Sequence, residues 1–567
     1  MTHYIIVTGG VISGVGKGVT TASLGKIFKE YGYTTTLIKI DPYINYDAGT
    51  LRPTEHGEVW VTYDGGEIDQ DLGTYERFID QDLPRTNSIT TGQIYSEVIA
   101  KERQGMYLGQ TVQFIPHIID QIKERIEQAA HGYDIAIIEI GGTVGDYENV
   151  PFLHVAKLLE RTLGQNRVAH VLVTYLPIPA HVQEMKTKPT QQAIRLLGQE
   201  GIIPDFIICR AERPLDPPRK KKIEHVAHIS SENVISAPDI DTIYQIPLDL
   251  EAEEVGKKLI KYFNLQSPAH VDWKVWSDLV HAIRFPTARV TIAVVGKYLA
   301  TGDYQLSDSY LSISHALIHA GAHARVAVDI QWIDASQLEN AHTIDALLGH
   351  VNGIIVPGGF GTAGVEGKIK AIEYARTRKV PYLGICYGMQ LAVIEFARNV
   401  IGLSKAHTTE VDLHTDHPVV DILPLQKQLL EEKSLGGTMR LGNYHASIMP
   451  HSHVYKLYHA AGRVDNGAIV ERHRHRYEVN PAYIDQLSTH GLIISGTHTR
   501  EDGTKLVEFI ELEDHPFFIA TQAHPEFTSR FETSHPLFSE FVLQAYQRQV
   551  KSSVFEHKKS HTPSVAL

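Results

Sequence analysis

Short apolar runs alternate with helix-like stretches along most of this 567-residue chain, and the alternation occurs in two series. In the first series the helical patterns include residues 20–31 and 113–130. Its apolar runs, which we interpret as strands, are Tyr4–Thr8, Thr35–Ile40, Asp134–Ile140, Val168–Tyr175 and Asp205–Cys209. Strands that alternate with helices predict a mostly parallel sheet with helices on both faces, so we expect an α/β domain in the first half.

The pattern lapses around residues 266–287, a mixed segment with two prolines and two tryptophans. A second series follows, with expected strands at Arg289–Val295, Ala327–Ile333, Gly353–Val356 and Tyr382–Ile385. A chain of this length is too long for a single hydrophobic core. We therefore predict two α/β domains of the same mostly parallel type, at 1–266 and 289–547, joined by a linker at 267–288 and followed by a disordered tail at 548–567.

Composition limits the class of protein. The chain has only two cysteines, Cys209 and Cys386, which excludes a disulfide framework and fits a reducing, cytoplasmic location. No secretory signal precedes the first expected strand, and no apolar run approaches the roughly 18 residues that span a bilayer. The formal net charge of −13 argues against general nucleic-acid affinity without excluding local phosphate sites. We therefore expect neither a membrane nor a nucleic acid as a partner.

Cys386 lies between an apolar run and a helix-like stretch, with Gly384 and Gly388 two places on either side. Small residues at these positions allow the tight strand-to-helix turn that exposes a nucleophile. The turn also places the sulfur at a helix N-terminus, whose positive end favours the reactive thiolate. The alternative is a buried core cysteine, and the flanking glycines favour the nucleophile over it.

A catalytic thiol needs a base, a group that orients the base, and donors for the oxyanion. Among 32 histidines, His524 stands out because it directly follows an apolar run and precedes a proline. Glu526 is close enough in sequence to orient its imidazole. Pro357–Gly361 can present free backbone N–H groups after an expected strand, and the N–H of Tyr387 is the expected second donor.

A glycine-rich loop, residues 9–18, follows the first expected strand and precedes a helix. Backbone N–H groups of such a loop converge on phosphate oxygens, and the helix N-terminus adds its positive end. Lys17 would reach the outer phosphates. The loop is a variant form, because it has one extra residue and carries Gly18 where a hydroxyl residue is usual. A plain glycine turn is the alternative.

A nucleotide–metal site also needs carboxylates. Glu139 lies at the carboxyl end of an expected strand, where parallel sheets place their ligands, and Asp71 lies in an acidic loop. Taken singly, each acid is a solvated or capping residue; together with Lys17 they predict two oxygen ligands for Mg²⁺. Lys39 adds a further cation at the end of the second expected strand.

A second basic group occupies residues 186–192, where lysines alternate with hydroxyl and amide side chains. This density of donors suits a polyphosphate together with a base or sugar, although composition alone also fits a solvated loop. The lysine run at 220–222 is a weaker signal, since such runs are common on protein surfaces.

These motifs resemble known families. The second half is similar to class I glutamine amidotransferases, because its Gly-Gly, Gly-x-Cys-x-Gly and His-Pro-Glu motifs occur in that order. The first half resembles the amidoligase domain of the CTP synthase family, including its P-loop-like nucleotide-binding fold. The strings that carry this resemblance are 13–18, 39–43, 71–78, 139–146 and 186–191. Together the two resemblances cover essentially residues 1–545.

The resemblance implies an enzyme that aminates UTP to CTP with ATP and Mg²⁺. ATP would phosphorylate O4 of the uracil ring, and ammonia would then attack C4. The ammonia would come from glutamine and pass through an internal channel. The resemblance further implies a homotetramer with nucleotide sites at subunit contacts, the capacity to form filaments, feedback inhibition by CTP and activation by GTP.

The resemblance also implies residue roles, with Cys386 as nucleophile, His524 as general base and Glu526 as its orienting group. The implied ATP-binding residues are Ser13, Gly14, Val15, Gly16, Lys17, Gly18, Lys39 and Asp71. The implied metal ligands are Asp71 and Glu139. The implied UTP and CTP ligands are Ser13, Asp146, Tyr147, Glu148, Lys186, Thr187, Lys188, Pro189, Thr190, Gln191 and Lys222. The implied glutamine ligands are Gly359, Tyr387, Gly388, Met389, Gln390, Glu410 and Arg476.

Two positions depart from the family pattern. The family usually has an arginine, tied to GTP activation, where this chain has Ala363, so activation is in doubt or depends on another cation such as Arg440. The residue after the nucleophile is usually leucine and here is Tyr387; if only its backbone N–H is used, the change is harmless.

Two other functions compete with this hypothesis. One is a different amidoligase built on the same two domains, such as one that amidates a cobalamin precursor; the 186–191 string and the Asp71 loop argue against it. The other is a catalytically inactive subunit of a filament. The presence of Cys386, His524 and Lys17 argues against that.

Overall fold

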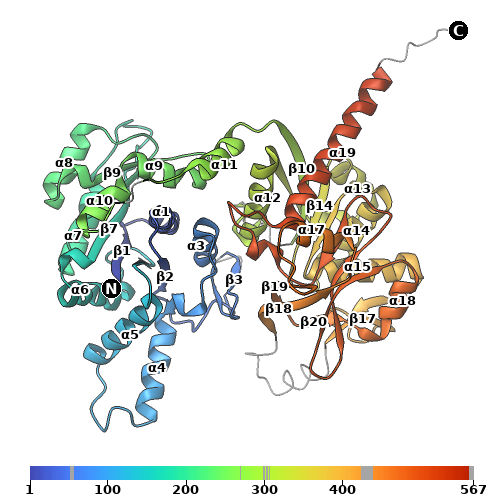
Figure 1. The fold of residues 1–567 in the computed structure, drawn as a ribbon, viewed down its shortest axis with the longest axis horizontal. Helices are drawn as coiled ribbons and strands as arrows, with labels where there is room; N and C mark the ends of the chain where they lie inside the picture. The colour runs from blue at the N-terminus through green and yellow to red at the C-terminus, as the bar shows by residue number, and fades with distance from the viewer. Residues whose placement is uncertain are drawn as a thin grey trace. The chain divides into compact units, whose positions relative to one another are not determined.

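The computed structural model describes residues 1–51, 57–267, 270–297, 300–301, 304–305, 307–359, 361–422 and 439–560. The chain forms two compact units. One comprises Met1–Leu51 and Glu67–Val280, and the other comprises Arg52–Gly66 and His281–Leu567. Figure 1 draws both units as a ribbon and labels many of their helices and strands. None of the described helices is both long enough and apolar enough to cross a membrane.

The first unit contains a seven-stranded sheet in the order β5-β2-β6-β1-β7-β8-β9, and every neighbouring pair in it is parallel. Its strands are β1 (His3–Gly9), β2 (Thr35–Asp41), β5 (Ser88–Thr90), β6 (Ile135–Ile140), β7 (Val168–Tyr175), β8 (Phe206–Ala211) and β9 (Val234–Pro238). The parallel α/β fold predicted for this half is confirmed.

Helices cover both faces of this sheet. They are α1 (Lys17–Glu30), α3 (Asp71–Ile79), α4 (Thr91–Arg103), α5 (Ile119–Ala130), α6 (Val150–Leu163), α7 (Lys188–Gln199), α8 (Pro217–Ala227), α9 (Ile246–Ala252) and α10 (Val255–Tyr262). Ile38 of β2 belongs to the core packed against α4–α7. The adjacent Leu37 points the other way, where its side chain lies against Gly25 of α1. This alternation follows from the two-residue period of a strand.

The second unit contains a nine-stranded sheet in the order β13-β10-β14-β15-β23-β22-β21-β18-β19. Its strands are β10 (Ala288–Gly296), β13 (Val326–Asp334), β14 (Gly353–Val356), β15 (Tyr382–Ile385), β18 (Arg440–Ile448), β19 (Ala468–His475), β21 (Ile493–Thr499), β22 (Lys505–Glu511) and β23 (Phe518–Thr521). The five strands from β13 to β23 are parallel, as predicted. The rest of the sheet is antiparallel, which the sequence analysis did not anticipate.

Two apolar cores cover the faces of this second sheet. One includes residues of α14 (Val365–Arg378) and α15 (Tyr387–Phe396), and the other includes residues of α12 (Leu311–Ala324), α17 (His453–Ala460) and α19 (Pro536–Ser560). Among the described residues this unit also contains helices α13 (Ala341–Leu348) and α18 (Ile484–Thr489). A small second sheet consists of β16 (Ala406–Thr408), β17 (His417–Ile422) and β20 (Tyr477–Val479).

The structure differs from the expected domain boundaries in three places. The expected linker contains a helix, α11 (Lys274–Arg284), because Trp276 is buried and its indole N–H donates to Tyr244 O at 2.7 Å. The expected tail is helical to Ser560, since apolar residues such as Phe541 hold the start of α19 in the core and the helix continues beyond them. Residues 561–567 lie outside the described part.

The third difference is β3 (Val59–Val61), which belongs to the second unit although it lies in the first half of the sequence. Trp60 packs against Phe527 with ring centroids 4.9 Å apart. The Arg472 guanidinium donates to Val61 O at 3.1 Å. Contacts between residues more than 400 positions apart leave no local signal in the sequence.

Candidate active sites

Cys386 lies between β15 and α15 in a strained backbone conformation, with φ 52° and ψ −101°. A positive φ is uncommon for a residue with a Cβ and is found where surrounding structure enforces it. The flanking glycines hold the Cys386 backbone in this conformation, because each packs closely against neighbouring atoms. A Cβ on Gly388 would lie 2.0 Å from Val356 O, and one on Gly384 would lie 2.6 Å from the Tyr382 hydroxyl. Both glycines are therefore required by close packing, as a nucleophile turn demands.

His524 follows β23 and is 8% exposed. Its Nδ1 lies 2.7 Å from Glu526 Oε1, and its Nε2 is buried with no hydrogen-bond partner among the described residues. Gly358 lies between the base and the thiol: a Cβ there would be 2.9 Å from His524 Cε1 and 3.6 Å from Cys386 Cβ. The structure therefore brings His524, Glu526 and Cys386 together.

The charges in this triad favour an ion pair. Burial lowers the pKa of His524, but the Glu526 carboxylate and the Cys386 sulfur outweigh burial and raise it to about 10. Glu526 is itself 2% exposed, so its negative charge acts through a region of low dielectric. A protonated imidazole beside the sulfur favours negative charge on a cysteine nucleophile.

The expected glutamine ligands lie around the triad. Glu410 Oε1 accepts a hydrogen bond from Gly361 N at 2.7 Å. Burial raises the pKa of Glu410, and Lys297 and Arg476 oppose this rise. The Arg476 Nε is buried and has no hydrogen-bond partner among the described residues, so it is available to a substrate carboxylate. Tyr387 begins α15, and the first N–H groups of a helix have no partner within the helix.

The side-chain amide of Gln390 is hydrogen-bonded within the protein, unlike that of a residue free to bind substrate. Its amide donates to Tyr477 O at 2.8 Å and to Gln522 Oε1 at 3.1 Å. Gln522 in turn donates to Cys386 Sγ at 3.7 Å. The Gln390 side chain thus orients a second amide toward the nucleophile. Gln522 was not identified from the sequence, although it lies two residues before His524.

Two lysines of this site were also missed. A Cβ on Gly359 would lie 3.4 Å from Lys297 Cε and 3.7 Å from Lys368 Nζ. Lys297 follows β10, and Lys368 lies near the start of α14. Neither belongs to a recognisable motif, so only the fold reveals that they lie beside the glycine loop.

Arg440, considered above as a substitute for the missing arginine at position 363, is buried in an ionic network. Its guanidinium lies 2.8 Å from Glu508, 3.2 Å from Glu478 and 4.4 Å from the Tyr444 ring centroid. It is only 8% exposed. These contacts occupy the cation and do not favour its binding a nucleotide directly.

In the first unit, the phosphate loop connects β1 to α1, and Gly14 and Gly16 adopt positive φ of 71° and 88°. Ser13 is exposed and Val15 is buried. The Lys17 ammonium donates to Gly142 O at 2.7 Å. Burial lowers the pKa of Lys17, and the nearby Glu139 carboxylate opposes this.

Acidic side chains converge on the first turn of α1. A Cβ on Gly18 would lie 2.9 Å from Asp71 Oδ1 and 3.6 Å from Glu139 Oε2, which explains why this loop has glycine at that position. Lys39 pairs with Asp71 and, at 2.8 Å, with Asp41. Burial and the Asp71 charge raise the pKa of Glu139 to about 7.

This arrangement fits a magnesium ion held mainly by a nucleotide. The described residues contain no group of three or more His, Cys, Asp or Glu side chains placed to hold a metal. Mg²⁺ in nucleotide sites is bound through one or two carboxylates, with phosphates and water supplying the other ligands. Asp71 and Glu139, both beside the first turn of α1, would supply the two carboxylates.

The expected pyrimidine-nucleotide residues lie in separate groups. Asp146 accepts from Thr143 N at 2.7 Å in the loop that also contacts Lys17. Thr190 forms a 3.1 Å hydrogen bond with Thr174, and a Cβ on Gly10 would lie 3.1 Å from the Thr174 hydroxyl. The 186–191 segment therefore lies next to the phosphate loop, at the carboxyl ends of parallel strands.

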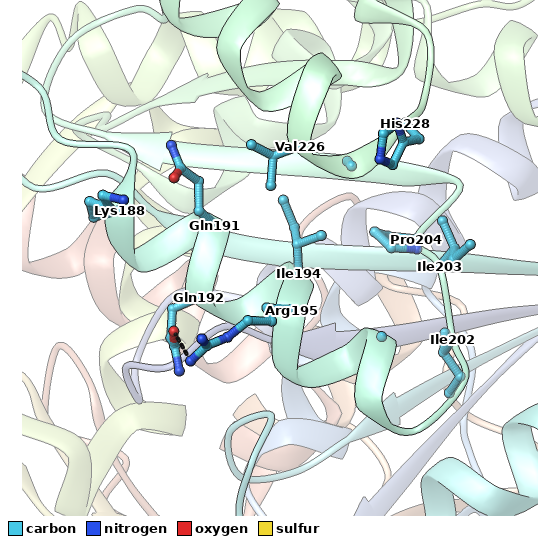
Figure 2. A pocket seen from close by; sticks show the side chains of 12 residues that line it. Lys188, Gln191, Gln192, Ile194, Arg195, Ile202, Ile203, Pro204, Val226 and His228 are labelled. Carbon is cyan, nitrogen blue, oxygen red and sulfur yellow. Dashed lines mark hydrogen bonds between the residues drawn. The ribbon is translucent and has the colours of Figure 1, made fainter.

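A cavity of about 460 Å³ lies between α7 and α8 (Figure 2). Lys188, Gln191 and Gln192 of the predicted 186–192 group line it together with Arg195 and His228, which were not predicted as ligands. The described residues that line this cavity do not include Ser13, Asp146–Glu148, Lys186 or Lys222. Lys186 instead pairs with Glu184 at 2.6 Å, and both Tyr147 and Lys222 are exposed.

The fold and the sites define a class of protein. A thiol elbow with an imidazole–carboxylate base, set on the sheet of a class I glutamine amidotransferase, is joined in one chain to a phosphate-loop unit with paired carboxylates. This is the organisation of a glutamine-dependent amidoligase.

Comparison with known proteins identifies the family. The CTP synthase N-terminus family matches residues 3–265, and the class-I glutamine amidotransferase family matches residues 305–544. CTP synthase of Pyrococcus furiosus is 50% identical and covers 98% of this chain and 100% of its own length. CTP synthase of Methanocaldococcus jannaschii is 50% identical, with coverage of 97% and 99%. The chain belongs to the CTP synthase family.

One solved structure is also similar in part. The Trypanosoma brucei CTPS glutaminase domain with bound acivicin is 38% identical, with a TM-score of 0.41, and covers 46% of this chain and 94% of its own.

Proposed function

We propose that this protein makes CTP from UTP, using ATP, Mg²⁺ and glutamine. The observation that carries the proposal is a Cys386–His524–Glu526 triad in the same chain as the Lys17 phosphate loop, in a sequence matched over 98% of its length by a CTP synthase.

Glutamine hydrolysis would use the charges already present in the second unit. The Cys386 thiolate attacks the side-chain carbonyl of glutamine, and the N–H groups of Gly359 and Tyr387 stabilise the oxyanion. The C–N bond then breaks, and the protonated His524 donates its proton to the departing ammonia. Water hydrolyses the thioester to glutamate. Arg476 and Glu410 would hold the α-carboxylate and the α-ammonium of the substrate.

The first unit would activate and aminate the pyrimidine. The γ-phosphoryl group of ATP is transferred to O4 of UTP and ADP is released; ammonia then attacks C4 and inorganic phosphate leaves. Lys17 and Lys39 neutralise phosphate charge, and their buried position strengthens that interaction. Asp71 and Glu139 would hold the Mg²⁺, which supplies further charge neutralisation when it is bound.

We place UTP and the inhibitor CTP against Ser13, Asp146–Glu148, Lys186–Gln191 and Lys222. The exposure of Tyr147 and Lys222 is consistent with a homotetramer whose subunits complete each other's nucleotide sites. Ammonia would reach the ligase site through a channel, because free ammonia is protonated in water. Ala363 and the buried Arg440 weigh against a GTP response that depends on either side chain.

The proposal is tested by following CTP formation with glutamine and, separately, with ammonium. Cys386→Ala should abolish the glutamine-driven reaction and leave the ammonium-driven one intact. Absence of CTP with either nitrogen source in the parent protein would refute the function, and loss of both reactions in a folded variant would refute the division of roles. Addition of GTP to the parent assay tests activation directly.

A further inference from the structure

Lys368 is buried beside the glutaminase site. It lies near the start of α14, and its side chain is 0% exposed. Its Nζ is buried and has no hydrogen-bond partner among the residues that the structure describes. A buried amine of this kind lowers stability, because it loses water without gaining a replacement. A residue that costs stability in this way calls for a functional explanation.

The amine lies directly behind the oxyanion loop. Its Nζ is 3.7 Å from the position of a Cβ on Gly359, on a loop whose preceding glycine contacts both His524 and Cys386. It also lies 5.6 Å from the centroid of the Tyr387 ring. A cation over an aromatic face at this distance is attracted by the ring, more strongly where water is excluded.

The Tyr387 side chain connects this cation to the loop. The ring is 2% exposed, and its hydroxyl donates to Gly361 O at 3.4 Å. The sequence analysis assigned a role only to the Tyr387 backbone N–H. The structure instead gives the side chain two contacts that a leucine could not make.

The charged groups facing the amine explain its titration. They are Lys297 at the end of β10 and Cys386 at the elbow, with His524 beyond Gly358. Burial and, less strongly, the Lys297 cation lower the pKa of Lys368, the Cys386 sulfur opposes both, and the pKa that results is about 7. The Cys386 sulfur is thus the group whose negative charge, when present, stabilises the ammonium form of Lys368.

We propose that Lys368 and Tyr387 form a positioning pair for the glutaminase: the amine, held over the Tyr387 ring behind Gly359, stabilises negative charge on Cys386 and supports the oxyanion loop. This rests on the proposed function for its reaction, but the charge on the thiol is measurable without any turnover. The two side chains act through Cys386 and Gly359 and do not themselves touch glutamine; the contact of Tyr387 with the substrate is through its backbone N–H.

The test is the rate of Cys386 alkylation by iodoacetamide as a function of pH in the full-length protein, with Cys386→Ala measuring the background from Cys209. Lys368→Met should slow alkylation at pH 7 about fivefold and shift the thiol titration to higher pH. It should lower glutamine-driven kcat about tenfold with little change in KM, and leave ammonium-driven CTP formation unchanged. Tyr387→Leu should act in the same direction, and the double variant should add little, as expected for coupled residues.

Lys370→Met is the matched control, because Lys370 lies two residues further along α14 and bonds to Glu339 O instead. A parental alkylation profile in Lys368→Met, or equal slowing in Lys370→Met, would overturn the proposal. If Lys368→Met does not fold, Lys368→Gln provides the same comparison. If the parent makes no CTP but alkylation still depends on Lys368, the proposed function fails and the pair stands.

Discussion

Gly388→Ala is the substitution whose effect the structure specifies most directly. The added Cβ would lie 2.0 Å from the carbonyl oxygen of Val356, whereas an ordinary contact requires 3.4–4 Å. The obstacle is backbone at the end of β14, so a rotamer change cannot relieve it. Either the start of α15 or the end of β14 must move by about 1.4 Å, the shortfall from the shorter of those contact distances.

This displacement affects stability and catalysis together. Overpacking of this kind costs about 1–3 kcal/mol, which corresponds to roughly 2–4 °C in Tm per kcal/mol for a domain of this size. Val356 directly precedes the oxyanion loop, and α15 begins at the nucleophile, so the same shift separates Gly359 from Cys386. A misplacement of about 1 Å costs about 100-fold in rate. We expect glutamine-driven CTP formation to fall by that factor.

The assay compares glutamine-driven and ammonium-driven CTP formation with thermal unfolding of the same samples. Ammonium-driven synthesis should persist, because the ligase residues belong to the other unit. Gly198→Ala is the control: apart from its chain neighbours and the backbone of its own helix, no described atom lies within 4 Å of the added Cβ, so this helix substitution should be neutral or stabilise by about 0.5–1 kcal/mol. A parental Tm and a parental glutamine-driven rate in Gly388→Ala would refute the packing argument.

Three further outcomes are expected. The raised pKa of His524 contributes stability that is fully present below pH 6.5 and is lost as pH rises to about 10. The free energy of unfolding in urea should therefore decline over this pH range, and Glu526→Gln should make the decline smaller. An unchanged dependence of the unfolding free energy on pH in Glu526→Gln would contradict the ion pair. Gly18→Ala should raise KM for ATP about tenfold in the ammonium-driven reaction, because its Cβ would displace Asp71, while glutamine hydrolysis alone should not change. Removal of Mg²⁺ with EDTA should stop CTP formation from either nitrogen source yet leave Cys386 alkylation as it was; persistent synthesis would refute a metal role for Asp71 and Glu139.

Much of the fold and of the triad was predictable because the signals are local. The elbow around Cys386, the phosphate loop and the His524–Glu526 pair each occupy only a few consecutive residues, and backbone geometry determines what such short segments can do. The parallel strands were equally visible, since buried strands appear as short apolar runs. The antiparallel strands β18, β19, β21 and β22 were missed because charged residues interrupt their apolar runs, as Arg472 does in β19 and Glu508 in β22.

The sequence by itself determined which candidate groups this chain carries: a thiol between a strand and a helix, an imidazole–carboxylate pair and a glycine-rich loop, each defined by neighbours in the chain. Only the tertiary structure decided what surrounds them. Lys368 is 18 residues from Cys386 in sequence, and Gly358 approaches His524 across more than 160 residues. Such distances are set by how strands and helices pack, because burial and electrostatic interactions depend on separation in space and not on order along the chain.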